Sequence, residues 1–389
     1  MPKNARTDDL SRSLAALDQH STLIVVVEMS WSGWLAAGLV PGVERQPKKK
    51  LEPDPEALLR LVQRWRQDAA AAGKPITRIA LAFEAGRDGF WLARWLQARG
   101  IETHVIHSTS VAVSRDKKRA KTDRLDAEML LRVFLGWLRG ERGHCSMVAV
   151  PTLAQEDARR PGREREALIA EQTRIINRLK AAMAWLGIRG FKPQLRSAPA
   201  KLDGLHTPEG VPIPSNTRAE IRRDMARLAI LRTQITEIED ARFERITADP
   251  ERGPHPMIKL LARVRGVGIE TAEMLVTEVM TRGLRDRRAV ARYAGITGSP
   301  DESGAKRRER GLSRAGNARV RRGMIQLAWR WLLFQKESAL TLWFRDRTAG
   351  APSLRKKMIV ALARKLLIAL WHLATAGVIP QGAVLRPAA

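Results

Sequence analysis

Four carboxylates in the first third of the chain have the types and spacing of a divalent-metal site. Glu28 and Glu84 each follow an apolar stretch, and Asp123 and Asp126 lie three positions apart in KTDRLDAEML. A spacing of three places two side chains on one face of a helix. Carboxylate oxygens are hard ligands that suit Mg²⁺, and two such ions about 4 Å apart can promote phosphoryl transfer. We therefore predict a magnesium site, with catalytic function, at Glu28, Glu84, Asp123 and Asp126.

A basic segment directly precedes the aspartate pair. Its lysines Lys117, Lys118 and Lys121 could contact the phosphates of a nucleic-acid backbone, which would position the substrate without reading its sequence. The alternative is a basic loop that is simply solvated.

The net charge supports a polyanionic partner. The 389 residues include 69 Lys and Arg against 41 Asp and Glu, a net charge of +28, and residues 255–389 alone carry 26 basic against 9 acidic residues. Nucleic acid and an anionic membrane surface are the two candidates. The chain has no run of eighteen apolar residues and no signal-peptide pattern at its N-terminus. We therefore expect nucleic-acid binding and no membrane association, with the contacts concentrated in the C-terminal region.

The single cysteine, Cys145, excludes an intramolecular disulfide and a cysteine-based zinc site. We expect it to be a partly buried free thiol.

A glycine turn in the C-terminal region has the layout helix, Gly-x-Gly, helix, in LLARVRGVGIETAEML. Gly266 and Gly268 would expose backbone N–H groups at a helix N-terminus, where a phosphate can bind. The turn resembles a helix-hairpin-helix DNA-binding motif, and a plain tight turn between helices is the alternative.

Serines and arginines follow in GSPDESGAKRRERGLSRAGNARVRR, where a serine near a phosphodiester could act as a nucleophile. Ser299, Ser303 and Ser313 are the candidates. From the chemistry alone a turn role is favoured, because no His–Asp relay is visible to activate a hydroxyl. The basic side chains that could bind DNA here are Lys306, Arg307, Arg308, Arg310, Arg314, Arg321 and Arg322.

The elements that must position these residues are predicted from apolar periodicity. After a flexible leader (1–20), an α/β domain with a partly parallel sheet is expected over 21–145. Its strands lie at 23–27, 34–40, 79–83 and 104–107, its helices at 55–71, between Glu84 and Gly100, and at 122–138, and 41–55 is a loop. The carboxyl ends of such strands are where sites form.

Beyond this domain we expect a polar linker (146–163), a helical region (164–250) and a mostly α-helical C-terminal domain (251–389). Apolar residues recur every three or four positions over 217–247, which fits an antiparallel coiled-coil arm or a simple helical bundle. The segment LRKKMIVALARKLLIALWHL is predicted to be a helix packed on the core with a basic outer face; a membrane-surface helix is the alternative.

The joint order of these features resembles a known family. Two acids end two separate strands, and an acidic pair follows a third strand. This order is similar to that of the ribonuclease-H/RuvC type of nuclease fold. FEAGRDGFWLARWL, KTDRLDAEML, RVRGVGIETA, RYAGITGSPDESG and GLSRAGNARVRRGMIQLAW, in this order, resemble the DEDD insertion-sequence transposases, family one-ten of the bacterial insertion sequences. The resemblance covers nearly the whole chain.

The resemblance implies a RuvC-like, magnesium-binding N-terminal domain, a coiled-coil arm and a C-terminal transposase domain with a catalytic serine. That serine falls on Ser303, with Ser299 as the second choice. It also implies recombination through a covalent serine–DNA linkage, a structured guide RNA, dimers that assemble into a tetramer, and a nucleoid-associated place in the bacterial cytoplasm. The family's first acid is usually Asp, whereas this chain has Glu28, which is one methylene longer.

Two other functions are compatible with the same residues. One is a RuvC-like two-metal nuclease that hydrolyses branched DNA without a covalent intermediate. The other is a catalytically degenerate protein that only binds nucleic acid.

Overall fold

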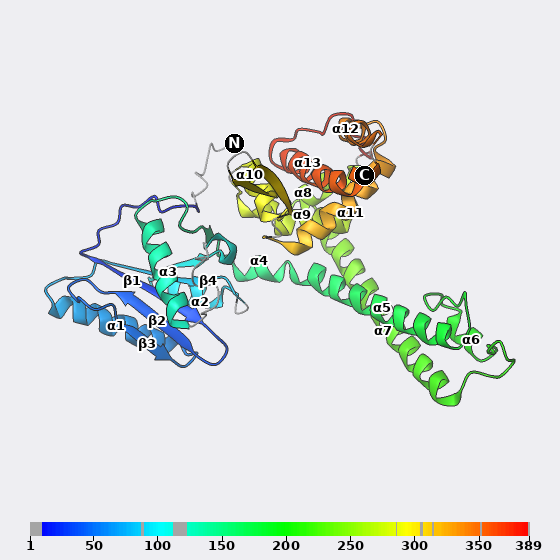
Figure 1. The fold of residues 1–389 in the computed structure, drawn as a ribbon, viewed down its shortest axis with the longest axis horizontal. Helices are drawn as coiled ribbons and strands as arrows, with labels where there is room; N and C mark the ends of the chain where they lie inside the picture. The colour runs from blue at the N-terminus through cyan, green and yellow to red at the C-terminus, as the bar shows by residue number, and fades with distance from the viewer. Residues whose placement is uncertain are drawn as a thin grey trace. The chain divides into compact units, whose positions relative to one another are not determined.

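The computed structural model describes residues 10–86, 89–111, 123–284, 286–303, 306–312, 315–350 and 352–387. The chain divides into two compact units, whose helices and strands are labelled in Figure 1. The first comprises Met1–Ala154 with Arg282–Arg321, and the second comprises Gln155–Thr281 with Arg322–Ala389. The predicted boundaries at 145 and 251 therefore do not delimit these units, because residues 282–321 group with the N-terminal part.

The first unit contains a six-stranded mixed sheet of order β3-β2-β1-β4-β5-β6. β1 pairs in parallel with β4, and β4 with β5, whereas the other neighbours are antiparallel. This confirms the predicted α/β class with a partly parallel sheet. The strands are β1 (Thr22–Met29), β2 (Trp34–Leu39), β3 (Lys48–Leu51), β4 (Arg78–Glu84), β5 (Glu102–Ile106) and β6 (Met147–Val148).

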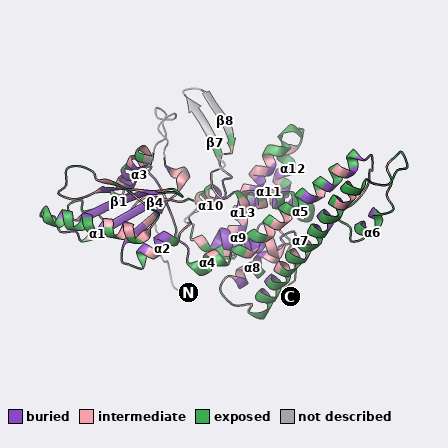
Figure 2. Ribbon diagram, turned by 90° about the horizontal axis from the view of Figure 1, so that it is seen from below, coloured by how far each residue is buried: buried purple, intermediate pink, exposed green. Residues whose placement is uncertain are grey.

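Both faces of the sheet are covered, which explains the continuous apolar runs of its central strands. Alternate residues of β1 and β4, such as Val27 and Phe83, pack with helices α1 (Pro55–Ala71) and α2 (Trp91–Gln97). The residues between them, such as Val26 and Ala82, pack with α3 (Asp123–Leu138). Figure 2 shows β1 and β4 as buried strands and the outer side of α1 as exposed.

Two predictions for this unit were wrong. The expected loop over 41–55 contains β3, an edge strand that pairs with β2; its lysines suit an edge that must stay soluble. The described part of the expected flexible leader, residues 10–20, is attached to the unit at Leu10, whose carbonyl accepts hydrogen bonds from Trp137 Nε1 (3.1 Å) and Met147 N (2.7 Å). Leu10 also contacts the core under α3, so apolar contact fixes this segment.

The C-terminal segment of the first unit holds α10 (Arg287–Tyr293) and a two-stranded hairpin of β7 (Gly298–Ser303) and β8 (Lys306–Leu312). This hairpin was not predicted, because PDESGAKRRER lacks the apolar alternation of a strand with a buried face.

The second unit is helical, as predicted for this part of the chain. α5 (Arg160–Trp185) and α7 (Ser215–Ala248) pack along a shared core that includes Leu179, Met183 and Leu228, with the short α6 (Ala198–Leu202) beside them. The predicted linker over 146–163 was wrong in part: it contains β6, α4 (Leu153–Asp157) and the start of α5. Pro161 lies in the first turn of α5, where a missing N–H costs no helical hydrogen bond.

The remaining elements are α8 (His255–Ala262), α9 (Ile269–Glu278), the short turn η3 (Met280–Arg282), α11 (Ala318–Phe334), α12 (Ala339–Thr348), η4 (Pro352–Leu354) and α13 (Arg355–Ala376). α13 buries one stripe that includes Leu362, Leu366 and Leu370, and it packs on α8 and α12. This confirms a core-packed helix. Among the described helices, only Pro352–Ala376 has the length and apolar composition to cross a membrane, and its buried stripe packs on α8 and α12.

Candidate active site

Glu28 and Glu84 lie side by side at the carboxyl ends of two adjacent parallel strands. Val27 of β1 is paired with Phe83 of β4, and Glu28 and Glu84 are the next residues of their strands. Because side chains alternate across a strand, both glutamates belong to the face that carries Val26 and Ala82. That face is the one covered by α3, and both glutamates are half-buried.

The helix that carries the aspartates covers this face, and its first turns lie toward the glutamate end. α3 begins at Asp123, and the half-buried Asp126 follows within the first turn. Two residues later, Glu128 forms an ion pair with Lys48 of β3. Lys48 is aligned with Ala37 of β2, and Ala37 with Val26 of β1, two residues before Glu28. The predicted site residues thus come from β1, β4 and the start of α3.

The donor set consists of carboxylates, which suits a hard divalent cation such as Mg²⁺. Within the described residues no group of three or more His, Cys, Asp or Glu side chains is close enough to share an ion. The Asp123 side chain is outside what is described, so the geometric test covers Glu28, Glu84 and Asp126. The residue types fit a metal site, and the strand register brings the two glutamates together.

The candidate serines lie in the β7–β8 hairpin. Ser303 ends β7 and is paired with Lys306, the first residue of β8, so Ser303 lies at the end of the hairpin where the two strands are joined. Ser299 is the second residue of β7. The hairpin register also aligns Glu302 with Arg307. The structure does not describe the side chains of residues 299–310, and residues 313 and 314 lie outside the described residues.

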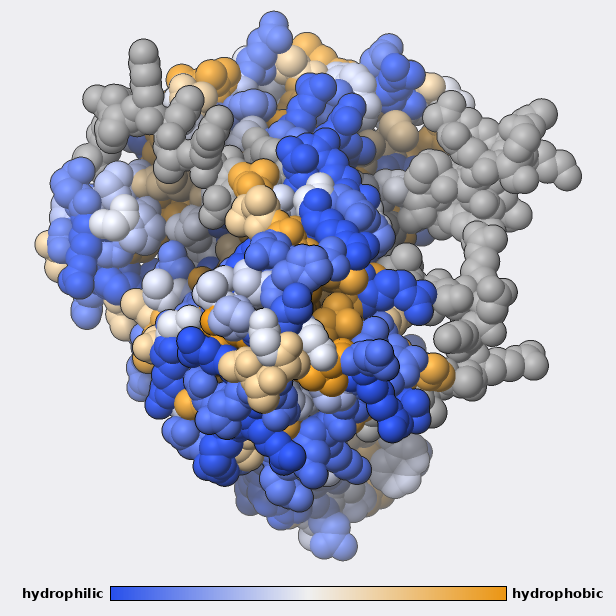
Figure 3. All heavy atoms as spheres, turned by 90° about the vertical axis from the view of Figure 1, so that its left-hand side faces the viewer, coloured by the Kyte–Doolittle hydropathy of each residue, from blue (hydrophilic) through white to orange (hydrophobic). Residues whose placement is uncertain are grey.

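Of the basic residues predicted to bind nucleic acid, two have described side chains. Arg321 approaches Gly295 so closely that a Cβ on this glycine would lie 2.5 Å from Nη1 of the arginine. Arg322 forms an ion pair with Glu166 and keeps 63% of its side chain exposed. Lys117, Lys118 and Lys121 lie outside the described residues. The face shown in Figure 3 is covered mainly by hydrophilic side chains, with smaller hydrophobic patches between them.

The glycine turn between α8 and α9 has the predicted local form. Gly266 adopts φ +94°, which favours glycine, and Gly268 is the N-cap residue of α9. Gly266 is buried, and a Cβ there would meet the Cβ of Phe334 at 3.1 Å. Close packing against α11 therefore explains Gly266, and the half-buried Gly268 is the better placed of the two for an external ligand.

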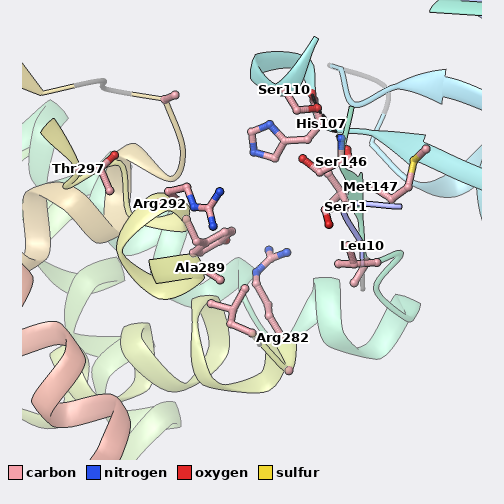
Figure 4. A pocket seen from close by; sticks show the side chains of 16 residues that line it. Leu10, Ser11, His107, Ser110, Ser146, Met147, Arg282, Ala289, Arg292 and Thr297 are labelled. Atoms are coloured by element: carbon pink, nitrogen blue, oxygen red, sulfur yellow. Dashed lines mark hydrogen bonds between the residues drawn. The ribbon is translucent and has the colours of Figure 1, made fainter. Parts of the chain in front are cut away.

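A cavity of about 470 Å³ in the first unit was not predicted. Its walls include His107 and Ser146 beside the sheet, and Arg282, Arg292 and Tyr293 around α10 (Figure 4). These residues come from distant segments, so no local motif marks them. Burial lowers the pKa of His107; the charge of Arg282 acts in the same direction, and the charge of Glu84 opposes it.

Cys145 is a buried free thiol, as expected. Burial raises its pKa to about 12, which leaves it protonated and unreactive at neutral pH.

Comparison with known proteins identifies the family. Residues 41–186 match the family model DEDD_Tnp_IS110, described as "Transposase", and residues 258–343 match "Transposase IS116/IS110/IS902 family". The first match contains Glu84, Asp123 and Asp126, and the second contains Ser303. The chain is also 40% identical over 375 residues to "Putative transposase y4rJ" of Sinorhizobium fredii, an alignment that covers 94% of each chain. The chain therefore belongs to the IS110 family of transposases and is an enzyme that acts on DNA.

Proposed function

We propose that this transposase is an RNA-guided DNA recombinase of RuvC-like architecture that uses Mg²⁺ and a serine nucleophile. The observation that carries the proposal is the register of β1 and β4, which aligns Glu28 with Glu84 on the face covered by α3. The sheet order supports the RuvC-like assignment, with an antiparallel β1-β2-β3 meander followed by β4 and β5 parallel to β1.

Glu28, Glu84, Asp123 and Asp126 would hold the metal. Bound Mg²⁺ would supply Lewis-acid stabilisation of charge on phosphate oxygens. The extra methylene of Glu28 is compatible with this role, because its strand ends beside Glu84 and a longer side chain can still reach the same edge. The carboxylates would hold the cation beside the scissile phosphate, since carboxylate and phosphate oxygens, both negatively charged, repel each other without it.

Ser303 is the proposed nucleophile. Its Oγ would form a bond to phosphorus while a deoxyribose oxygen leaves with a proton, and attack of another strand's hydroxyl on this linkage would release the serine. Each step breaks one P–O bond and forms another, so the reaction needs no oxidant and no nucleoside triphosphate. The position of Ser303 supports the proposal, since it lies at an end of the hairpin and is flanked by the basic strand β8.

The net charge of +28 supports binding of both DNA and a structured guide RNA. The α5–α7 helix pair is the proposed coiled-coil arm for a dimer that assembles into a tetramer. The exposed Trp185 at the end of α5, with 78% of its surface accessible, offers an apolar contact for a second copy. Guidance by RNA can be tested in two steps. One specific RNA should co-purify with the protein, and recombination in a reconstituted assay should require it.

The test of the nucleophile is a denaturation-resistant protein–DNA adduct. Ser303→Ala is expected to abolish both the adduct and strand exchange, because no other atom would replace Oγ. Ser299→Ala is the matched control on the same strand and should retain both. An intact adduct in Ser303→Ala would remove this assignment, and cleavage without any adduct in the parent enzyme would favour the hydrolytic nuclease.

The test of the carboxylates is Asp126→Asn, which removes a charge with little change in shape. We expect loss of magnesium-dependent strand exchange with DNA binding retained. Glu128→Gln is the control on the same helix, since Glu128 is paired with Lys48. Unchanged recombination in Asp126→Asn would exclude Asp126 from the site.

A further inference from the structure

One wall of the cavity in the first unit is built from the residues that follow β5 and from the residue that precedes β6. Ser110 Oγ donates to the carbonyl of His107 (2.6 Å) and accepts from Ser146 N (2.9 Å), and His107 N donates to the carbonyl of Ser146 (2.9 Å). These hydrogen bonds fix the η1 turn (Ser108–Ser110) against the residue that precedes β6. The wall is therefore held in a defined conformation, and Leu10, Met147 and Val148 give it apolar surface beside the two serines.

The opposite wall carries two cations and an aromatic ring. The guanidinium of Arg282 lies over the ring of Tyr293, with its Cζ 4.6 Å from the ring centroid. Asn317 Nδ2 donates to the Tyr293 hydroxyl (2.9 Å), which holds the ring in place. Figure 4 shows the Arg282 and Arg292 side chains directed toward the space in front of His107 and Ser146. Cations beside a fixed aromatic ring are the combination that binds a phosphate and an adjacent base.

The cavity adjoins the carboxylate edge of the sheet. Glu84 at the end of β4 is paired with Ile106 at the end of β5, and His107 of the cavity wall is the next residue. Ser108 Oγ also donates to the carbonyl of Ala85 (2.7 Å), which ties the two chain segments together beyond the strands. A DNA strand that reaches Glu84 would therefore place a neighbouring nucleotide near the cavity.

We propose that this cavity binds one nucleotide of the DNA strand beside the scissile phosphate, with Arg282 and Arg292 contacting its phosphate and Tyr293 contacting its base. The volume of about 470 Å³ lies within the range of sites for small organic ligands. This inference rests on the proposed function of the carboxylate edge. It adds a substrate contact made by the chain segment 282–297, which none of the predicted site residues supplied.

Binding without catalysis tests the proposal. Full-length protein is titrated with fluorescein-labelled oligothymidylate in EDTA, and anisotropy is followed over a range of salt concentrations. Arg292→Gln should weaken binding about tenfold, as expected for one charge-assisted contact, and should lower the salt slope by about 0.7. Arg64→Gln is the matched control, because Arg64 is an exposed arginine on α1, on the opposite face of the sheet from α3.

The aromatic contact has its own readouts. Tyr293→Leu should weaken binding about fivefold or more, whereas Tyr293→Phe, which keeps the ring, should bind nearly as the parent protein does. An oligomer that contains 5-iododeoxyuridine should photo-crosslink to a peptide that includes Tyr293. An abasic oligomer of equal length should bind less tightly and be insensitive to Tyr293→Leu.

Two results would overturn the proposal. One is equal affinity and salt slope for Arg292→Gln and Arg64→Gln, with crosslinks mapped away from the cavity. The other is that an RNA oligomer of the same sequence and length binds more tightly than the DNA and loses the same affinity in Arg292→Gln and Tyr293→Leu. That result would assign the cavity to RNA. Neither measurement depends on strand exchange, so failure of the Ser303 mechanism would leave the binding result standing, and the reverse also holds.

Discussion

A buried carboxylate holds the long helix pair of the second unit together, and its removal has a predictable effect. Asp224 of α7 has 2% of its side chain exposed and accepts two hydrogen bonds from Arg178 of α5, at 2.7 Å and 2.6 Å. Arg227 donates a third, at 2.7 Å. The perturbation is Asp224→Asn, which preserves the shape of the side chain and removes its charge.

The free-energy cost of Asp224→Asn depends on how far its two arginine partners are exposed to water. Loss of one partner from a fully buried ion pair costs about 3–5 kcal/mol, and loss of an exposed pair costs about 0–1 kcal/mol. The Arg178 and Arg227 side chains are 49% and 60% exposed, so water can solvate them when the charge of Asp224 is removed. We therefore expect an intermediate cost of about 2 kcal/mol, or roughly a 30-fold shift in the opening equilibrium of the helix pair.

Hydrogen exchange measures this opening locally. Backbone amides around Leu179 in α5 and Leu228 in α7 should lose about 30-fold protection in Asp224→Asn. Asp240→Asn is the control, because Asp240 is exposed on the same helix and its replacement should change stability by less than about 0.5 kcal/mol. Equal protection in the two variants would refute the idea that the Asp224 hydrogen bonds couple α5 to α7.

Three further predictions concern the first unit. Gly316→Ala should destabilise it by about 2 kcal/mol more than Gly73→Ala in urea unfolding. At Gly316 (φ +117°) a Cβ would overlap the carbonyl oxygen of Tyr293, whereas at Gly73 nothing lies within 4 Å; equal effects would contradict this. Hydrogen bonds from Arg78 lower the pKa of Glu102 from 4.5 to about 2. This contribution is complete above pH 4.5 and is lost as pH falls toward 2, so Glu102→Gln should reduce the pH dependence of unfolding in that window, as measured by circular dichroism. Chelation of divalent ions should stop strand exchange while DNA binding by anisotropy persists, and added Mg²⁺ should restore it; exchange that continues in EDTA would contradict the metal role.

Much of the first unit could be predicted from local sequence. The apolar runs before Glu28 and Glu84 predict strands, because residues buried on both faces of a sheet leave no polar alternation. The helix at 55–71 was predicted with its observed bounds from its apolar spacing, and the structure adds the Asp54 side chain that caps its N-terminus. Five motifs in a fixed order, from FEAGRDGFWLARWL to GLSRAGNARVRRGMIQLAW, also led to the family, which the comparisons confirm.

Other features carried no local signature. β3 and the β7–β8 hairpin are charged, so hydrogen bonding to a neighbouring strand, not burial of an alternating face, makes them strands. The segment from Leu10 looked like a leader because only a few apolar residues attach it to the core.

The sequence by itself determined the residue types of the candidate site: the four carboxylates, the serines and the excess of basic side chains. Those follow from composition and spacing, which need no knowledge of distant contacts. Tertiary structure decided that Glu28 and Glu84 share one row of the sheet and that residues 282–321 group with the N-terminal unit. It also decided that His107 and Arg292 line one cavity. The physical reason is that register and packing join segments far apart in the chain, and no periodicity within either segment records which partner it meets.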